Sequence, residues 1–175
     1  MNIFYLSDDP KQCAQWMVDR HVIKMILETA QLLSTAHRVL DGEQYTDKQN
    51  NRSIKRWKLN DDREYAIYKA THINHPSAVW TRESVENYNW LFDHFIALND
   101  EYTYRFQKTH LSKELGIILN SPPLNLKEWD MTPMCSAMDT KYIVSKNPID
   151  NYRNYYKMGK THLHKWTKRD KPEWI

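Results

Sequence analysis

Apolar residues recur at helical spacing between Pro10 and Leu40 and predict one long helix. The positions expected to face the core follow one another at steps of three and four residues: Val18, Val22, Met25, Ile26, Leu33, Ala36 and Leu40. Asp9 is a suitable N-cap, and Pro10 suits the first helical turn because its missing N–H needs no partner there.

A polar stripe runs beside the apolar one at the same spacing. It consists of His21, Lys24, Glu28, Gln31 and Thr35, which lie above one another along a helix. The stripe is open to two interpretations. It is either a solvated flank with a weak Lys24–Glu28 pair, or one wall of a polar pocket that offers an imidazole, an amine and a carboxylate.

The remaining pattern predicts short elements around a second long helix. We expect an extended segment or packed arm over 2–6, an irregular polar stretch over 41–60, a short helix over 61–69, a loop over 71–76, a long helix over 76–105, a short helix over 112–119, a proline-containing loop over 120–147 and a helix from 148 to about 158. The predicted fold is mainly α: one compact helical domain over 1–175 with two long helices, a short N-terminal extended segment and a long proline-containing loop.

Composition excludes several classes of protein. An apolar fraction of 41% with 13% aromatic residues favours a folded domain. The three glycines form neither a dinucleotide-binding fingerprint nor a P-loop. Cys13 and Cys135 have no metal-binding or redox spacing, so we expect reduced thiols. The N-terminus has no basic leader and no segment could span a membrane, which predicts a cytoplasmic protein.

The net charge of +3 is unevenly distributed. One basic group lies between Lys157 and Lys171, and another surrounds Trp57 and consists of Lys48, Arg52, Lys55, Arg56 and Lys58. Cations interleaved with aromatic rings suit phosphate contact and base stacking, although a solvated lysine-rich tail has the same composition. We predict that DNA or a nucleotide is the partner.

Candidate site residues come from several predicted helices. The catalytic candidates are His21, Lys24, Glu28 and Glu101. The substrate-binding candidates are Asn74, His75, Arg82, Arg105, Tyr152, Arg153, Tyr156, Lys160, Lys165, Lys168 and Arg169. Arg82–Glu86 and Glu101–Arg105 are equally interpretable as surface ion pairs. His37 is expected in the core, and His94 is expected at solvent or beside a helix neighbour.

We expect neither a metal nor another cofactor. The pairs His72–His75 and His162–His164 have no carboxylate at ligand spacing, whereas a zinc or iron site needs three or four converging ligands. No motif for a serine or cysteine nucleophile is present.

Four segments together resemble a family of short phage-encoded proteins. These are the opening 1–6, the run 19–25 (DRHVIKM), the loop 71–76 (THINHP) and the ending 166–169 with 172–174. The family's activity is unsettled. The resemblance implies a phage protein that acts in the cytoplasm of a bacterial host.

A local resemblance concerns residues 152–160 (YRNYYKMGK), which are similar to the aromatic and basic C-terminal segment of phage pyrimidine-dimer DNA glycosylases. In that family an N-terminal amine is the nucleophile after removal of the initiator Met, and a glutamate assists. Here Asn2 follows Met1, a context in which Met is usually retained. No catalytic residue is carried over from that family.

These observations lead to a functional hypothesis. We expect a glycosylase-like hydrolase or lyase that processes bases in DNA or in a DNA-derived nucleotide. Glu28 or Glu101 would polarise water or stabilise positive charge, His21 would carry protons, and Lys24 would bind phosphate or form an imine. The alternative is a non-enzymatic phage effector that binds a host protein through its abundant Trp and Tyr residues.

Overall fold

The first predicted long helix is two helices in the structure, a computed structural model that describes residues 1–175. Helix α1 spans Pro10–Trp16 and helix α2 spans Asp19–Asp41. Asp9 caps α1 as expected, because its side chain accepts a hydrogen bond from the Gln12 amide at 2.6 Å. Met17 and Val18 between the two helices have extended backbone angles.

Contacts with distant residues stabilise this break. The guanidinium of Arg105 donates hydrogen bonds to the carbonyl oxygens of Met17 and Gln15, both at 2.8 Å. The Asp19 amide donates to the carbonyl oxygen of Lys165 at 2.8 Å. These partners lie in the middle and at the end of the chain, so the local pattern could not predict the break.

The second predicted long helix is also divided. Helix α4 spans Pro76–Thr81 and helix α5 spans Val85–Phe106. Ser84 separates them because its hydroxyl accepts a hydrogen bond from the Asn87 amide, which makes it the N-cap of α5. Helix α5 ends at Gln107, which has a left-handed conformation with φ of 56°.

The polar stretch after α2 forms a β-hairpin, so the prediction of irregular structure there was wrong. Strand β1 (Glu43–Gln49) pairs with strand β2 (Arg52–Lys58) in antiparallel register. Asn50 and Asn51 form the turn with φ of 50° and 59°, which Asn tolerates better than most residues. The Asn-Asn pair was the available signal, but neither strand has the apolar alternation that marks a half-buried strand.

The hairpin leaves α2 at Gly42, where two backbones approach closely. A Cβ atom on Gly42 would lie 2.5 Å from the Arg38 carbonyl oxygen and 3.0 Å from that of Lys58. Arg38 is buried and donates to the carbonyl oxygen of Trp57 at 3.1 Å. The base of the hairpin is therefore fixed to the end of α2.

Shorter elements complete the mainly helical fold. They are α3 (Arg63–Ala66), the 3₁₀ helix η1 (Leu111–Leu115), α6 (Gly116–Leu119), η2 (Thr140–Tyr142), α7 (Pro148–Gly159) and η3 (Thr161–Leu163). The prediction for α7 is confirmed, and Asn147 caps it by accepting from the Ile149 amide at 3.0 Å. Residues 120–147 form the expected loop apart from η2.

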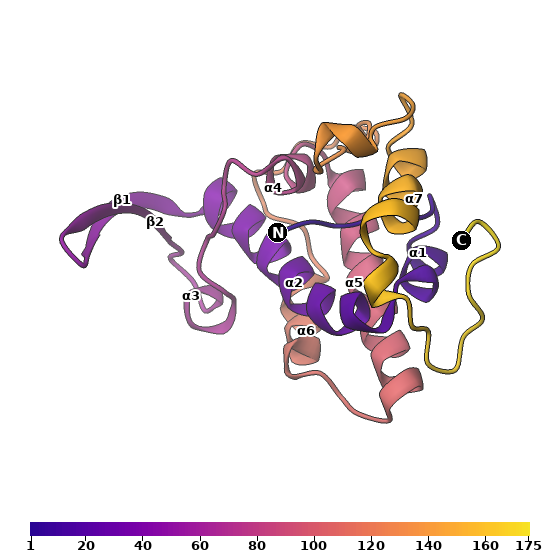
Figure 1. Cartoon of the computed structure of the whole chain (residues 1–175). Helices are drawn as coiled ribbons and strands as arrows, with labels where there is room; N and C mark the ends of the chain where they lie inside the picture. Colours follow the sequence, from indigo (N-terminus) through magenta and orange to yellow (C-terminus); the bar gives the residue numbers. More distant parts are fainter.

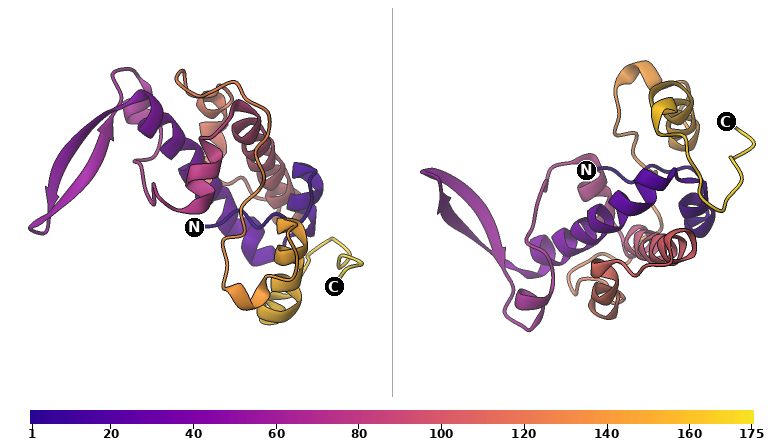
Figure 2. Two further views of the ribbon diagram at one scale, coloured as in Figure 1. Left: turned by 90° about the horizontal axis from the view of Figure 1, so that it is seen from above. Right: turned by 60° about the horizontal axis from the view of Figure 1, so that its bottom comes forward.

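Helices α2 and α5 pack against each other, and α1 lies on α5 (Figure 1). The first six residues form the expected arm and not a strand, and Ile3, Phe4, Tyr5 and Leu6 are buried in the core. The hairpin extends away from the helices on the side opposite the C-terminus (Figure 2). No helix combines the length and hydropathy needed to cross a membrane.

Candidate functional site at the N-terminal amine

Glu28, in the middle of α2, lies beside the first residues of the chain. One of its carboxylate oxygens, Oε2, accepts a hydrogen bond from the Asn2 amide at 3.0 Å and lies 3.9 Å from the Met1 ammonium. The other oxygen, Oε1, lies 2.9 Å from Lys24 Nζ. The Glu28 side chain is 12% exposed and that of Lys24 is 65% exposed. A carboxylate thus lies between two amines at the edge of the core.

The Asn2 side chain holds the start of the chain in this position. Its Nδ2 donates to the Ala137 carbonyl oxygen at 2.7 Å, and its Oδ1 accepts from the Tyr152 hydroxyl at 2.6 Å and from the Ile3 amide at 2.8 Å. Phe4 has a positive φ of 61°, which turns the arm into the core. The terminal amine is therefore fixed relative to Glu28.

His75 lies at the same cluster, at the start of α4. Its Nδ1 accepts a hydrogen bond from the Ser77 amide at 3.2 Å, so the neutral ring carries its proton on Nε2. Burial lowers the pKa of His75, and the positive charges of the terminal amine and His72 lower it further, whereas Glu28 opposes the shift. His75 is thus a neutral hydrogen-bond donor within electrostatic range of the amine and of Glu28.

His21 lies one helical turn before Lys24 but is buried, with 5% of its surface exposed. Its ring stacks on Phe4 with ring centroids 4.2 Å apart, and its Nδ1 is hydrogen-bonded to the Tyr156 hydroxyl. Burial, followed by the charges of Lys160 and Lys24, lowers the pKa of His21 to about 3. The predicted role as proton carrier does not fit a ring that stays neutral near pH 7; His21 supports the arm.

Glu101, near the C-terminal end of α5, belongs to a separate, buried network. Its Oε1 accepts hydrogen bonds from Arg105 at 2.6 Å and from Arg169 at 2.9 Å. Burial alone raises the pKa of Glu101, but hydrogen bonds from Arg169 and Arg105 and their positive charges lower this pKa overall. Arg105 also pairs with Asp19 at 3.0 Å and is 2% exposed. The predicted catalytic role of Glu101 and binding role of Arg105 are thus replaced by structural ones.

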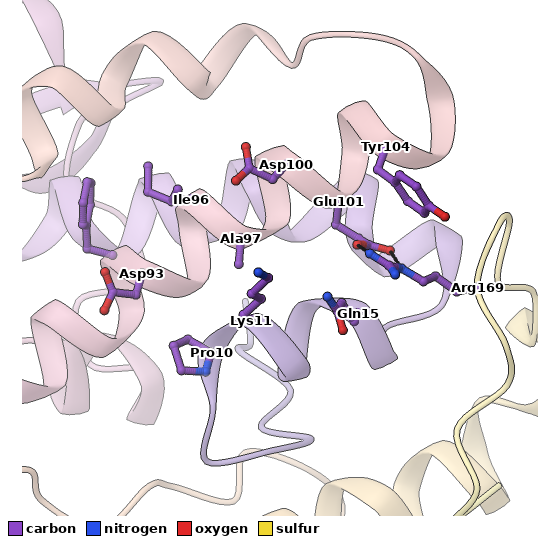
Figure 3. A pocket seen from close by; sticks show the side chains of 11 residues that line it. Pro10, Lys11, Gln15, Asp93, Ile96, Ala97, Asp100, Glu101, Tyr104 and Arg169 are labelled. Carbon is purple, nitrogen blue, oxygen red and sulfur yellow. Dashed lines mark hydrogen bonds and ion pairs between the residues drawn. The ribbon is translucent and has the colours of Figure 1, made fainter.

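Figure 3 shows the Glu101–Arg169 pair at one end of a groove between α1 and α5. The groove has a volume of about 630 Å³ and is also lined by Ile96, Ala97 and Tyr104. None of Met1, Lys24, Glu28 and His75 lines it. This groove and the amine cluster are therefore different places.

Arg82 and Asn74 do not extend the cluster. Arg82 Nη1 donates to the Ala78 carbonyl oxygen at 2.7 Å and lines a cavity with Glu83 and Thr132. It forms no ion pair with Glu86. Asn74 is exposed in the loop before His75. The candidate residues therefore divide: Lys24 pairs with Glu28, His75 is within electrostatic range of Glu28, His21 lies buried one helical turn from Lys24, and Arg82 and Glu101 have other partners.

The C-terminal candidates divide in the same way. Tyr152 and Tyr156 are fully buried, so neither ring can stack on a base. Arg153 donates to the Leu6 carbonyl oxygen at 3.0 Å and lies over the Trp16 ring, and its role is structural. Lys160 lies 4.7 Å from the centre of the Tyr155 ring.

Beyond α7, Lys165 and Lys168 are exposed, although Lys168 Nζ donates to the Tyr104 carbonyl oxygen at 2.9 Å. Arg169 is held by Glu101. Lys160, Lys165 and Lys168 therefore remain available to a phosphate, whereas Arg169 is engaged.

Other histidines have structural partners. His37 is in the core as predicted and bonds the Tyr88 hydroxyl at 2.8 Å. His94 is fully buried, and the second of its two predicted positions holds, since its ring stacks on Trp90 one turn earlier on α5; its Nδ1 donates to the Pro10 carbonyl oxygen at 2.9 Å. No group of three or more His, Cys, Asp and Glu side chains is arranged to hold a metal ion. Both cysteines are free thiols.

The residues that sequence reasoning missed are Met1 and Asn2. They lie 26 residues or more from Glu28 in sequence, and no spacing rule connects them. The only signal was the local glycosylase resemblance, which implied an N-terminal amine assisted by a glutamate. Comparisons with family models, with curated proteins and with solved structures find no match.

Proposed function

We propose that this protein is a glycosylase-like enzyme of phage origin that processes bases in DNA through its N-terminal amine and Glu28. The observation that supports the proposal most is the Met1 amine 3.9 Å from the Glu28 carboxylate, with Lys24 and His75 beside them. Imine-forming catalysis needs an unprotonated amine, and an adjacent carboxylate that acts as a general base is one way to supply it.

The proposed reaction begins when Glu28 accepts a proton from the terminal ammonium. The freed nitrogen lone pair attacks C1′ of the target nucleotide, a C–N bond forms, and the glycosidic bond breaks with its electrons leaving on the base. The new secondary ammonium gives one proton to the departing base, which restores the nitrogen lone pair. This lone pair then expels the ring oxygen O4′ while Glu28 returns its proton to O4′, and the sugar opens to leave a protonated imine between C1′ and the protein. Hydrolysis of the imine releases the amine.

Neighbouring side chains suit the other steps of this reaction. Lys24 is exposed and next to Glu28, so it can contact the phosphate of the target nucleotide. The Nε2–H of His75 can donate a hydrogen bond to the departing base. Lys160, whose charge acts on His21, and the exposed Lys157 and Lys165 extend the positive surface along the backbone of the substrate.

Borohydride trapping tests the proposal. The protein is incubated with an oligonucleotide duplex that contains an abasic site, sodium borohydride reduces any imine, and the cross-linked peptide is mapped by mass spectrometry. We expect a cross-link on the N-terminal residue, and a loss of about a hundredfold in the trapping rate for Glu28→Gln because proton transfer is lost. Glu86→Gln, an exposed glutamate on α5, is the matched control.

The same experiment separates the two candidate amines. Insertion of one Gln between Met1 and Asn2, a residue large enough for Met1 to be retained, moves the terminal amine away from Glu28 and should abolish trapping, whereas Lys24→Ala should retain it. A cross-link mapped to Lys24 would transfer the nucleophilic role to that side chain. If Met1 is removed in the cell, the Asn2 nitrogen, already 3.0 Å from Glu28, becomes the amine. Absence of any cross-link across damaged and abasic duplexes would refute the proposal.

A further inference from the structure

The β1–β2 hairpin has no role in the core. Its strands contact the rest of the fold at the end of α2, and the remainder extends into solvent (Figure 2). Among its side chains only Asp47, Ile54, Arg56 and Trp57 are partly buried, and the others are exposed. A two-stranded ribbon with no packed face adds little to the stability of the fold, and most of its side chains are free to contact a partner.

The two faces of the hairpin differ in charge. Side chains alternate along each strand, so Glu43, Tyr45, Asp47, Gln49, Arg52, Ile54, Arg56 and Lys58 share one face, and Gln44, Thr46, Lys48, Ser53, Lys55 and Trp57 share the other. The first face contains both acids, with Glu43 opposite Lys58 and Asp47 3.8 Å from Arg56. The second face contains no acid.

The uncompensated cations lie toward the tip. Lys48, Arg52 and Lys55 are exposed and form no ion pair with any acid of the chain. Lys48 and Lys55 share the second face with Gln44, Thr46 and Ser53, which are neutral hydrogen-bonding side chains. Lysines that contact phosphate beside neutral side chains that contact base edges are a combination suited to a DNA groove.

The dimensions of the hairpin agree with this partner. Two paired strands lie about 4.8 Å apart, and seven residues extend for about 23 Å. The major groove of B-form DNA is about 12 Å wide and about 8.5 Å deep and admits a two-stranded β-ribbon. The deep, narrow major groove of A-form RNA does not. The hairpin therefore fits duplex DNA better than duplex RNA.

We infer that the β1–β2 hairpin is a DNA-binding ribbon that enters the major groove with its acid-free face, and that Lys48 and Lys55 contact the phosphates of the groove walls. The inference rests on the proposed function for the choice of DNA as partner, but it does not depend on the chemistry at Glu28. The hairpin projects from one end of α2, whereas Glu28 lies near its middle. The ribbon thus binds duplex at a distance from the nucleotide that reacts.

Binding measurements on matched variants test this inference. Fluorescence anisotropy gives the affinity of the full chain for a duplex DNA of 20 base pairs (about two helical turns) and for an RNA duplex of the same sequence, at several salt concentrations. We expect Lys48→Gln/Lys55→Gln to weaken DNA binding about tenfold and to reduce the salt slope by about 2, because each lost phosphate contact removes about one unit. RNA binding should change by less than about twofold.

The control is Lys108→Gln/Lys113→Gln, which removes two exposed lysines outside the hairpin and changes the net charge equally. Equal losses in both double variants would show that only net charge matters and would overturn the inference, as would equal losses on DNA and RNA. The inference would also be overturned if the hairpin variant kept the DNA affinity of the wild type and both proteins captured the same partner from a lysate. Thermal unfolding of both variants verifies that they fold.

Trapping on a short single-stranded oligonucleotide distinguishes the two proposals. The hairpin variant should still form the imine with this oligonucleotide, because the single strand contains no duplex for the hairpin to bind. Hairpin-dependent duplex binding without any imine would support the ribbon and refute the proposed catalysis. Imine formation together with a duplex affinity that does not depend on the hairpin would support the proposed catalysis and refute the DNA-binding ribbon.

Discussion

Two ion-pair clusters on the long helices use the same local geometry and have opposite properties. In one, Lys24 and Glu28 form an i, i+4 pair at 2.9 Å, with side chains 65% and 12% exposed. In the other, Glu101 and Arg105 form an i, i+4 pair at 2.6 Å, with side chains 3% and 0% exposed. Spacing along a helix creates both pairs, but only burial separates a pair that can act on a ligand from one that holds the fold together.

The surroundings explain the difference. Arg105 donates four hydrogen bonds, to Glu101, Asp19 and the carbonyl oxygens of Met17 and Gln15, and its side chain is buried, so a substrate cannot reach the guanidinium. Lys24 has only Glu28 as a charged partner. The buried network thus connects α1, α2, α5 and the C-terminal segment, whereas the ion pairs and hydrogen bonds of Glu28 connect α2 to the N-terminal arm.

The largest expected effect is at the buried cluster. Arg105→Ala leaves Asp19 and Glu101 with fewer partners and should lower the free energy of unfolding by about 3–5 kcal/mol, the usual cost of breaking a buried pair. Urea denaturation followed by tryptophan fluorescence measures it. The double variant Glu101→Gln/Arg105→Met should recover part of the loss, because no charge is then left alone between those two positions. A loss below about 1 kcal/mol for Arg105→Ala would contradict a structural role.

A change of pH is expected to have an intermediate effect on the free energy of unfolding, because the buried His21 binds a proton less readily in the folded chain than in the unfolded one. The folded pKa of His21 is about 3, against 6.5 for an exposed histidine, chiefly through burial. As pH falls from about 6.5 toward 3, the unfolded chain binds a proton that the folded chain does not. Stability contributed by the neutral ring is therefore complete above pH 6.5 and decreases by about 1.4 kcal/mol per pH unit below it.

Urea denaturation between pH 7.5 and pH 4.5 measures this dependence, and His37 and His94, whose pKa values burial lowers to about 4, act in the same direction. His21→Gln should be less stable than wild type at pH 7.5 but should lose less stability on acidification. His162→Gln, at an exposed histidine, is the control. Identical pH profiles for the two variants would show that His21 titrates normally.

The smallest effect on stability is expected at the open cluster. Lys24→Ala removes an exposed partner of Glu28 and should cost less than about 0.5 kcal/mol, because solvent screens such pairs. Thermal unfolding measures the change, and Lys11→Ala, at an exposed lysine on α1, is the control. A cost near that of Arg105→Ala would mean that both clusters are structural.

The sequence was informative wherever a local signal decided the outcome. Asp9, Asn147 and the proline after each predict helix starts that the structure contains, and the periodicity of α2 predicts its buried face. The sequence did not predict the helix breaks at Met17–Val18 and at 82–84. The apolar pattern continues through both places, and the breaks are stabilised by distant partners in the first case and by the Ser84 cap in the second. The hairpin was missed because both of its faces are polar.

For the candidate site, the stripe Lys24–Glu28 and the loop residue His75 could be identified from sequence, since helical spacing and proline restriction are local properties. The sequence could not show which polar residues would be buried, because Tyr152, Tyr156 and Glu101 differ from exposed residues of the same type only in their tertiary neighbours.

The sequence by itself therefore determined a mainly helical chain, the caps and the amine-carboxylate pair on α2. Only the tertiary structure decided that the first two residues return to Glu28, because the Asn2 contacts with Ala137 and Tyr152 span most of the chain. Contacts between residues so far apart depend on the packing of the whole core, and no local pattern encodes them.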